Sequence, residues 1–280
     1  MFVTRLISGI VLVAVALLTI CSGGWILYGT LTIVSLIGMF ELYRAVKVQK
    51  QGENLLAVVG YLGVILHYIL LSLGYSEYYC NLKFQFIPDM MLFVIALLVV
   101  LMFVYVFSYP KYHAEQVMAA FFGVVYVGVM LSYIYQTRMI RDGAFLVWLI
   151  FLCSWGCDTC AYCVGMLIGK NKMSPVLSPK KSVEGAVGGV VGAALLGAIY
   201  AAVVGSHLEA ENPVITYAII CAVGALISMV GDLAASAIKR NHNIKDYGTL
   251  IPGHGGIMDR FDSVIFTAPV IYYLSMFMMR

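Results

Sequence analysis

The stretch SAIKRNHNIKDYGTLIPGHGGIMDRFD, residues 236–262, is the most polar part of a chain that is otherwise largely apolar. It holds four cationic and three acidic side chains, and it lies between two long apolar runs. Charged groups are costly beside a hydrocarbon environment, and where they persist they usually serve binding or chemistry. This stretch therefore indicates both the class of fold and the place where function is expected.

The composition places the chain among membrane proteins. Of its 280 residues, 62% are hydrophobic and only 11% are charged, whereas charged residues make up about a quarter of a soluble domain. Apolar runs that approach the ~20 residues of a membrane-spanning helix recur along the whole length. Because helices satisfy their own backbone hydrogen bonds in lipid, we predict an all-α, polytopic integral membrane protein. No nucleic-acid partner is expected.

Nine apolar runs predict about nine transmembrane helices. They cover residues 6–21, 25–42, 55–73, 91–107, 116–135, 145–168, 183–204, 214–233 and 264–279. The first run could be a signal peptide, but it leads directly into a second apolar run, which favours a retained helix. We divide the chain into membrane helices in residues 1–135 and a catalytic region in residues 136–280, whose polar loops are 169–182 and 234–262.

The positive charges predict the orientation. With the N-terminus in the cytoplasm, thirteen of the seventeen Lys and Arg residues fall on the cytoplasmic side. The four exceptions are Lys83, Arg138, Arg141 and Arg280. Such an excess of Lys and Arg is typical of cytoplasmic segments. We therefore expect a multi-pass protein of the plasma or inner membrane, with both polar loops and the active site on the cytoplasmic side.

Three aspartates border the predicted ends of the last two membrane helices. Asp232 ends one apolar run, and Asp259 and Asp262 precede the next. If the intervening loop folds back, Asp232 and Asp259 meet and offer oxygen ligands to one or two Mg²⁺ ions that grip a polyphosphate. The alternative is that these carboxylates are solvated charges at helix ends, paired with Arg240 or Arg260.

The cations of the two polar loops are candidates for binding phosphate groups. Lysine and arginine neutralise phosphate charge, and arginine does so with two parallel hydrogen bonds. The residues concerned are Lys180, Lys181, Lys239, Arg240, Lys245 and Arg260. Lys180 and Lys181 follow the turn sequence Ser178-Pro179 and suit either a phosphate or an anionic lipid. The competing explanation is anchoring on the positive side of the membrane.

Two further features have the composition of a binding site. Gly253-His254-Gly255-Gly256 offers backbone that approaches an anion closely, or else forms only a re-entrant turn. Asp158 lies inside an apolar run, where an acidic side chain faces a cavity or a partner. It shares a helix face with Tyr162, four residues on. This pair serves either a ligand or a contact between helices.

Four cysteines, Cys153, Cys157, Cys160 and Cys163, have spacings that resemble those of iron–sulfur ligands. Such ligands need an irregular loop in order to converge on one cluster. These cysteines lie in a helix-like apolar run, where cysteine behaves as a small hydrophobic residue. Packing is therefore the favoured interpretation.

The polar stretch resembles the signature of the phosphatidate cytidylyltransferases, also called CDP-diacylglycerol synthases. That signature reads S-x-hydrophobic-K-R, four residues, K-D, a small residue two on, then P-x-H-G-G and D-R-hydrophobic-D. The matching positions are Ser236, Ile238, Lys239, Arg240, Lys245, Asp246, Gly248, Pro252, His254, Gly255, Gly256, Asp259, Arg260, Phe261 and Asp262. Residues 158–162, 169–170 and 178–185 resemble further elements of the family.

The resemblance implies a multi-helix membrane enzyme that transfers CMP from CTP to phosphatidic acid, giving CDP-diacylglycerol and pyrophosphate for phospholipid biosynthesis. It also implies Mg²⁺ as cofactor, a monovalent cation such as K⁺ at the same site, membrane lipid as a partner, and a homodimer. In such an enzyme Asp232 and Asp259 would be the metal ligands.

Charge and resemblance together suggest roles for the other residues. The expected catalytic residues are Asp232, Asp259, Lys239, Arg240 and Arg260, and the expected substrate contacts are Ser178, Lys180, Lys181, Ser236, Lys245, His254, Gly255 and Gly256. Supporting roles are expected for Asp158, Tyr162, Asp246 and Asp262. Two rival functions remain open: a CTP-dependent lipid-alcohol kinase, which would transfer the γ-phosphate, and an ion-coupled transporter that uses Asp158 and Asp232.

Overall fold

The computed structural model describes residues 2–49, 54–80, 90–205, 208 and 212–278, and their side chains except those of 2–6 and 75–80. Lys50, Lys83 and Arg280, which entered the predicted charge balance, lie outside the described residues. The chain forms two compact units, residues 29–132 and residues 1–28 with 133–280. The predicted division after residue 135 lies near one of these boundaries, but the first helix groups with the C-terminal unit.

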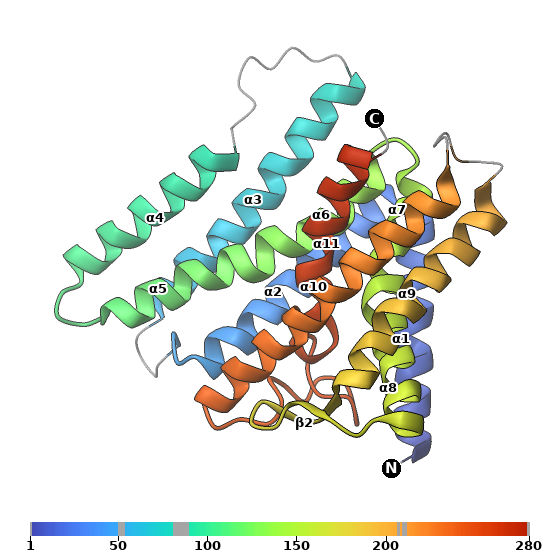
Figure 1. Cartoon of the computed structure of the whole chain (residues 1–280). Coiled ribbons are helices and arrows are strands. Elements are labelled where there is room, and N and C mark those ends of the chain that lie inside the picture. Colours follow the sequence, from blue (N-terminus) through green and yellow to red (C-terminus); the bar gives the residue numbers. More distant parts are fainter. Residues whose placement is uncertain (1, 50–53, 81–89, 206–207, 209–211, 279–280) are drawn as a thin grey trace. The chain divides into compact units, whose positions relative to one another are not determined.

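The described chain is almost wholly helical (Figure 1). Residues 29–132 contain most of α2 (Gly24–Ala45), then α3 (Leu55–Cys80), α4 (Met90–Phe107), α5 (Ala114–Gly123) and the π-helical turn η1 (Val124–Val129). The other unit holds α1 (Phe2–Ser22), most of α6 (Met130–Met139), α7 (Gly143–Phe151), the π-helical turn η2 (Leu152–Gly156), α8 (Cys157–Ile168), β1 (Lys172–Ser174), β2 (Ser178–Ser182), α9 (Val183–Val204), α10 (Pro213–Asn241) and α11 (Met258–Met278).

Eight helical segments of the described chain are long and apolar enough to cross a membrane. They are residues 24–45, 55–74, 90–107, 114–139, 143–168, 183–204, 213–241 and 258–278. The described part of α1 adds a shorter apolar stretch, Ile7–Ser22. The all-α, polytopic membrane class is thus confirmed, whereas the count of nine spans and the cytoplasmic N-terminus stay predictions.

The predicted loop 234–262 is wrong at both ends. Helix α10 continues to Asn241 and helix α11 already begins at Met258, so the loop covers only residues 242–257. Residues 234–241, AASAIKRN, combine four polar side chains with three alanines and an isoleucine, and they contain neither glycine nor proline, so nothing in them stops a helix. Three predicted site residues therefore lie on α10, namely Ser236, Lys239 and Arg240, and three lie on α11, namely Asp259, Arg260 and Asp262.

The predicted loop 169–182 contains a two-stranded antiparallel hairpin, β1–β2. The carboxylate of Glu184, on the first turn of α9, accepts hydrogen bonds from the backbone N–H groups of Lys170 (3.1 Å) and Asn171 (3.2 Å). Ser182 caps the same helix, because its Oγ accepts from the N–H of Gly185 at 3.1 Å. The bonds of Glu184 tie the segment that leads into the hairpin to the start of α9, and the bond of Ser182 satisfies an N–H group that a helix start leaves unpaired.

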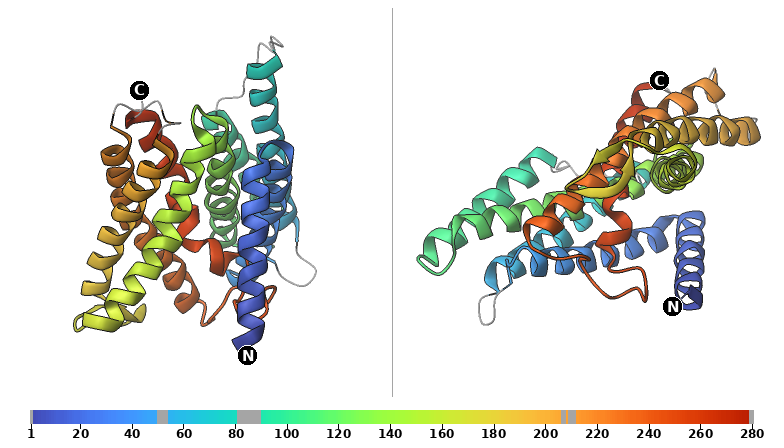
Figure 2. Two further views of the ribbon diagram at one scale, coloured as in Figure 1. Left: turned by 90° about the vertical axis from the view of Figure 1, so that its right-hand side faces the viewer. Right: turned by 60° about the horizontal axis from the view of Figure 1, so that its bottom comes forward.

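Helices α8, α9 and α10 pack against one another in sequence order, and α10 also packs against α11 (Figure 2). Glycines of α9 make room for cysteines of α8: a Cβ at Gly189 would lie 2.9 Å from Cys157 Sγ, and one at Gly192 would lie 2.5 Å from Cys160 Sγ. Cys157 is fully buried, whereas Cys163 is exposed. Cys157 and Cys160 thus pack against glycines of α9, as the sequence interpretation favoured.

Within residues 29–132, four buried polar side chains form two hydrogen-bonded pairs. Ser35 Oγ lies 2.9 Å from Tyr68 Oη, and His67 Nε2 lies 2.9 Å from Ser132 Oγ. All four side chains are almost completely buried. Burial of a polar group is costly unless it is hydrogen-bonded, and these pairs meet that requirement inside apolar helices.

Candidate functional site

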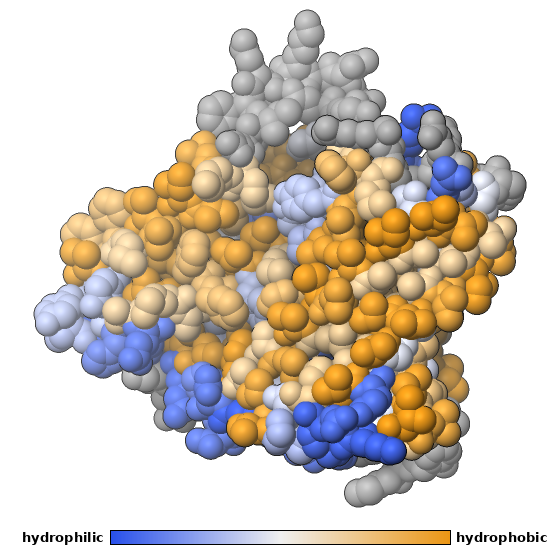
Figure 3. All heavy atoms as spheres, viewed as in Figure 1, coloured by the Kyte–Doolittle hydropathy of each residue, from blue (hydrophilic) through white to orange (hydrophobic). Residues whose placement is uncertain are grey.

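A cavity of about 480 Å³ lies in the unit formed by residues 1–28 and 133–280. Its walls come from α8, the β1–β2 hairpin, the start of α9, the end of α10, the loop that follows, and the start of α11. Methionines 166, 173 and 229 line it together with many charged side chains. On the face seen in Figure 3, hydrophilic residues gather around the hairpin while hydrophobic residues cover α9 and α10.

Ten of the predicted site residues line this cavity. They are Asp158, Tyr162, Lys180, Lys181, Asp232, Lys239, Asp246, Asp259, Arg260 and Asp262. Asp232 and Asp259, which are 27 positions apart in the sequence, thus border the same space. The loop between α10 and α11 reverses the chain direction and brings the polar ends of the two helices together.

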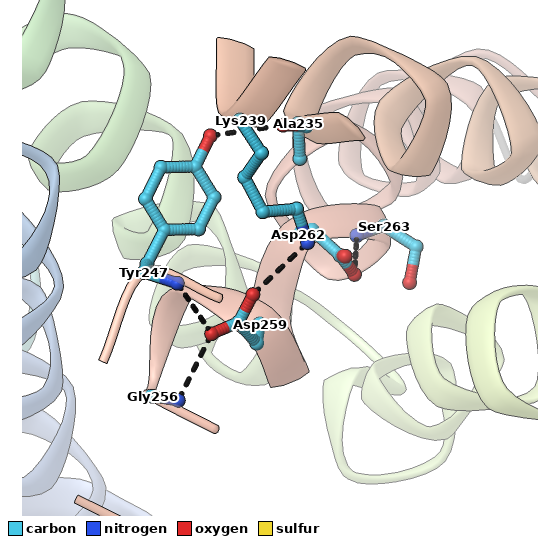
Figure 4. A network of polar contacts seen from close by, with 7 residues as sticks. All are labelled: Ala235, Lys239, Tyr247, Gly256, Asp259, Asp262 and Ser263. Carbon is cyan, nitrogen blue, oxygen red and sulfur yellow. Dashed lines mark hydrogen bonds and ion pairs between the residues drawn. The ribbon is translucent and has the colours of Figure 1, made fainter. Parts of the chain in front are cut away.

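Asp259 is held by three donors (Figure 4). Its Oδ2 accepts hydrogen bonds from the backbone N–H groups of Tyr247 (2.8 Å) and Gly256 (3.0 Å), and its Oδ1 lies 2.9 Å from Lys239 Nζ. The side chain is only 7% exposed. Gly255 has a φ of +86°, and a Cβ there would lie 2.8 Å from Oδ2 of Asp259. Only glycine fits this position without strain.

Tyr247 is a positioning residue that the sequence interpretation missed. Its Oη donates to the carbonyl of Ala235 at 3.1 Å, and Lys239 Nζ lies 5.4 Å from the centre of its ring. The ring therefore attracts the ammonium group that pairs with Asp259. The available signal was a single aromatic side chain between Asp246 and Gly248 in a polar loop.

Asp232 of α10 forms an ion pair with Lys181 of β2. Both side chains are partly buried, with 23% and 25% of their surfaces exposed. The carboxylates of Asp158 and Asp262 lie close enough to interact electrostatically with Asp232. Asp262 is 9% exposed and accepts a hydrogen bond from the backbone N–H of Ser263 at 2.8 Å. Acidic groups from three helices therefore share one space.

Arg260 has an unused hydrogen-bond donor. It lines the cavity, and its Nε is buried without a hydrogen-bond partner among the described residues. A buried donor left unpaired costs about 1–3 kcal/mol. A ligand oxygen would satisfy this donor, and a phosphate oxygen is an acceptor well suited to a guanidinium group.

The other predicted site residues do not line the cavity. They are Ser178, Ser236, Arg240, Lys245, His254, Gly255 and Gly256. Arg240 is exposed because successive residues of a helix point about 100° apart, so it faces away where Lys239 faces inward. Lys245 is exposed in the loop. The two glycines shape the backbone around Asp259. Direct contact of these residues with substrate stays a prediction.

The carboxylates of the cavity suit a hard cation. No three His, Cys, Asp or Glu side chains form a ready metal site in the part of the chain that is described. However, Mg²⁺ commonly uses only one or two carboxylates and takes its other ligands from water and substrate phosphates. Asp232 and Asp259 border one space and fit that requirement. A metal ion would compete there with Lys181 and Lys239.

Known proteins resemble this chain over most of its length. The model of the cytidylyltransferase family matches residues 3–278. A phosphatidate cytidylyltransferase of Bacillus subtilis (strain 168) is 30% identical over 240 residues, which cover 85% of this chain and 84% of that protein. One from Synechocystis sp. is 28% identical over an aligned length of 299, covering 96% and 94%. One from Staphylococcus epidermidis is 34% identical over 151 residues, covering 54% and 56%. This chain, with its charged cavity at the ends of apolar helices, belongs to the cytidylyltransferase family.

Proposed function

We propose that this membrane protein transfers CMP from CTP to phosphatidic acid, giving CDP-diacylglycerol and pyrophosphate for phospholipid synthesis. The observation that carries the proposal is a single cavity lined both by charged side chains and by methionines. A nucleoside triphosphate needs the charged groups, and a phospholipid needs charged and apolar groups together. The names of the relatives support the same substrates.

The charge of the lining supports a role for divalent cations. Five carboxylates against four cations leave the wall with a formal charge of −1. Because CTP and phosphatidic acid are both anions, such a wall alone would not draw them together. We propose that Asp232 and Asp259 hold Mg²⁺, and that a monovalent cation such as K⁺ shares the site. Bound Mg²⁺ would neutralise the charge that develops on the phosphate oxygens.

We assign the phosphate contacts to Lys181, Lys239 and Arg260, with Lys180 beside them. In the reaction, a phosphate oxygen of phosphatidic acid attacks the α-phosphorus of CTP. The bond from that phosphorus to the bridging oxygen of the β-phosphate breaks, and pyrophosphate leaves. The nucleophile is already ionised, so no general base is required, and fixed cations stabilise the transition state.

Supporting roles are proposed for the remaining acidic groups. Asp158, Asp246 and Asp262 line the cavity without a lysine partner at ion-pair distance within the described residues. Their negative charges attract the lysine and arginine side chains of the lining and so keep these cations directed into the cavity. Tyr162 lies on the same face of α8 as Asp158 and offers a surface to the lipid or the base.

The site is proposed to face the cytoplasm, because CTP is cytosolic and most Lys and Arg residues fall on that side in the predicted topology. The protein is further proposed to act as a homodimer in the plasma or inner membrane. Neither point affects the chemistry assigned to the cavity.

Two differently labelled substrates test the proposed reaction. Purified protein in mixed micelles with phosphatidic acid and Mg²⁺ is given CTP labelled with ³²P at the α-phosphate or at the γ-phosphate. We expect α-label in the lipid phase and γ-label in pyrophosphate. Transfer of γ-label to an added lipid alcohol, with release of CDP, would identify a lipid kinase instead. Absence of α-label from the lipid would contradict the proposal.

A metal control accompanies this experiment. Chelation of divalent cations with EDTA should abolish the transfer of α-label, and added Mg²⁺ should restore it. Unchanged transfer in EDTA would contradict the metal assignment while leaving the reaction itself in place.

A further inference from the structure

Helix α1 contacts the loop that shapes the site, although none of its described side chains lines the cavity. Ser8 Oγ donates to the carbonyl of Pro252 at 3.0 Å and lies 2.8 Å from His254 Nδ1. The next residue, Gly9, lies beside the ring, and a Cβ there would be in ordinary van der Waals contact with His254 Cε1 at 3.7 Å. Both views of Figure 2 show the loop between α10 and α11 passing beside the N-terminal part of α1.

The two contacts of Ser8 define the roles of the atoms involved. A serine hydroxyl has one proton to donate and two lone pairs with which to accept. Because the carbonyl of Pro252 can only accept, the proton of Ser8 goes there. Ser8 Oγ then accepts from Nδ1–H of His254. One hydroxyl thereby fixes a backbone carbonyl and the orientation of an imidazole ring two residues further on.

The segment that Ser8 holds is a tight turn. The N–H of His254 donates to the carbonyl of Ile251 at 2.9 Å, and the N–H of Ile251 donates to the carbonyl of Gly255 at 2.8 Å. Gly253 and Gly255 have φ values of +77° and +86°. Gly256 follows directly, and its N–H donates to the Asp259 carboxylate. A displacement of His254 therefore reaches Asp259 through two residues of constrained backbone.

We infer that Ser8 is a positioning residue of the site. By holding Pro252 and His254, it fixes the turn whose Gly256 N–H orients the carboxylate of Asp259. Ser8 itself is not among the residues that line the cavity, so it is assigned a positioning role through Pro252 and His254. The effect of Ser8 on turnover rests on the proposed function, whereas its hold on the loop does not depend on which reaction the protein catalyses.

Amide hydrogen exchange measures how strongly Ser8 stabilises the loop, and it does so independently of enzyme activity. In the full-length protein in detergent, Ser8→Ala should accelerate amide exchange about 10-fold in peptides that cover residues 247–257, since one net hydrogen bond is worth roughly that factor. Ser8→Thr keeps the hydroxyl and should restore slow exchange.

Thr19 provides the matched control. It lies on the same helix, but its Oγ1 bonds to the carbonyls of Val15 (2.8 Å) and Ala16 (3.1 Å) within α1. Thr19→Ala should therefore leave exchange in residues 247–257 unchanged. If Ser8→Ala also leaves it unchanged, or if Thr19→Ala changes it as much, the inference is overturned.

Kinetics test what the hold does for the site. Ser8→Ala should lower kcat for CMP transfer about 10-fold and leave KM for phosphatidic acid within about twofold, because the loop orients a catalytic carboxylate and not the lipid. The double variant Ser8→Ala/His254→Ala should turn over no more slowly than His254→Ala alone. Additive losses would overturn the inference, as would normal turnover of Ser8→Ala. If the unaltered protein forms no CDP-diacylglycerol, the proposed function fails. The exchange experiment then still tests whether Ser8 holds the loop.

Discussion

Both units of this protein are built from apolar helices, but among the described residues only one of them gathers charged side chains around a cavity. In residues 29–132, buried polar side chains such as His67 and Ser132 satisfy each other. In the other unit, charged side chains of α8, α10, α11 and the hairpin meet around an open cavity, and Arg260 Nε has no partner among the described residues. Satisfied polar groups add stability, whereas unsatisfied ones are available to a substrate.

This difference predicts where substitutions act. Changes around the cavity should lower turnover while the protein stays folded, and changes to the paired groups of residues 29–132 should lower stability while turnover per folded molecule stays normal. The following experiments test that separation, beginning with the largest expected effect.

Asp232→Asn should reduce CMP transfer about 1,000-fold, because it weakens the proposed metal site and leaves Lys181 without its acidic partner. The measurement is kcat from the α-label assay, with size-exclusion profiles and melting curves to verify folding. Asp232 is partly exposed, so we expect the fold to survive. Near-normal turnover of this variant would show that the cavity works without the carboxylate.

Gly255→Ala should reduce turnover about 100-fold by displacing Asp259. The new Cβ would lie 2.8 Å from Oδ2 of Asp259 at a positive φ that alanine adopts with strain. Gly29→Ala in α2 is the matched control, since no heavy atom lies within 4 Å of its Cβ position. It should keep full turnover and gain slightly in stability. Equal losses in both variants would break the separation between the units.

His67→Leu should lower the free energy of unfolding by about 1–3 kcal/mol, because Ser132 loses a buried partner. Thermal melting in detergent would show the loss as a lower midpoint. The kcat of the remaining folded protein should stay within about twofold of normal. A variant with a normal midpoint and lost turnover would mean that residues 29–132 take part in the reaction.

Arg240→Ala and Lys245→Ala should have the smallest effect, changing turnover by less than about threefold. Both cations are exposed and neither lines the cavity, and exposed charges act weakly and are screened by salt. The comparison is kcat/KM for CTP at low and high ionic strength. A loss above tenfold that persists in high salt would place these residues on the substrate, as the family signature suggested.

The sequence predicted the helices well where hydropathy changes sharply. The predicted run 183–204 coincides with α9. The prediction failed at residues 234–241, because the strongly apolar run ends at Leu233 although no residue of 234–241 ends a helix. Hydropathy measures how strongly a segment prefers lipid to water. Helix α10 continues beyond its strongly apolar segment, so hydropathy does not show where the helix ends.

Several charged residues that line the cavity could be singled out from the sequence, because a mixed signature of unusual length carries Lys239, Asp246, Asp259, Arg260 and Asp262. Their pairing could not be predicted. Nothing in the sequence couples Lys181 to Asp232, or Ser8 to His254 across 246 positions. Such contacts depend on how the helices pack in three dimensions. A local pattern of residue types does not show which residues far apart in the sequence come together.

The length of α10 determines the depth in the membrane at which the site can bind a phospholipid headgroup. Asp232 is the twentieth of its 29 residues, so about 30 Å of helix precedes it, which equals the thickness of a hydrocarbon core. The nine residues that follow rise roughly 13 Å further, through the layer where headgroups reside. An upright α10 thus sets the aspartate at the resting depth of a lipid phosphate. The substrate can arrive and depart by lateral diffusion, with its acyl chains never leaving the leaflet.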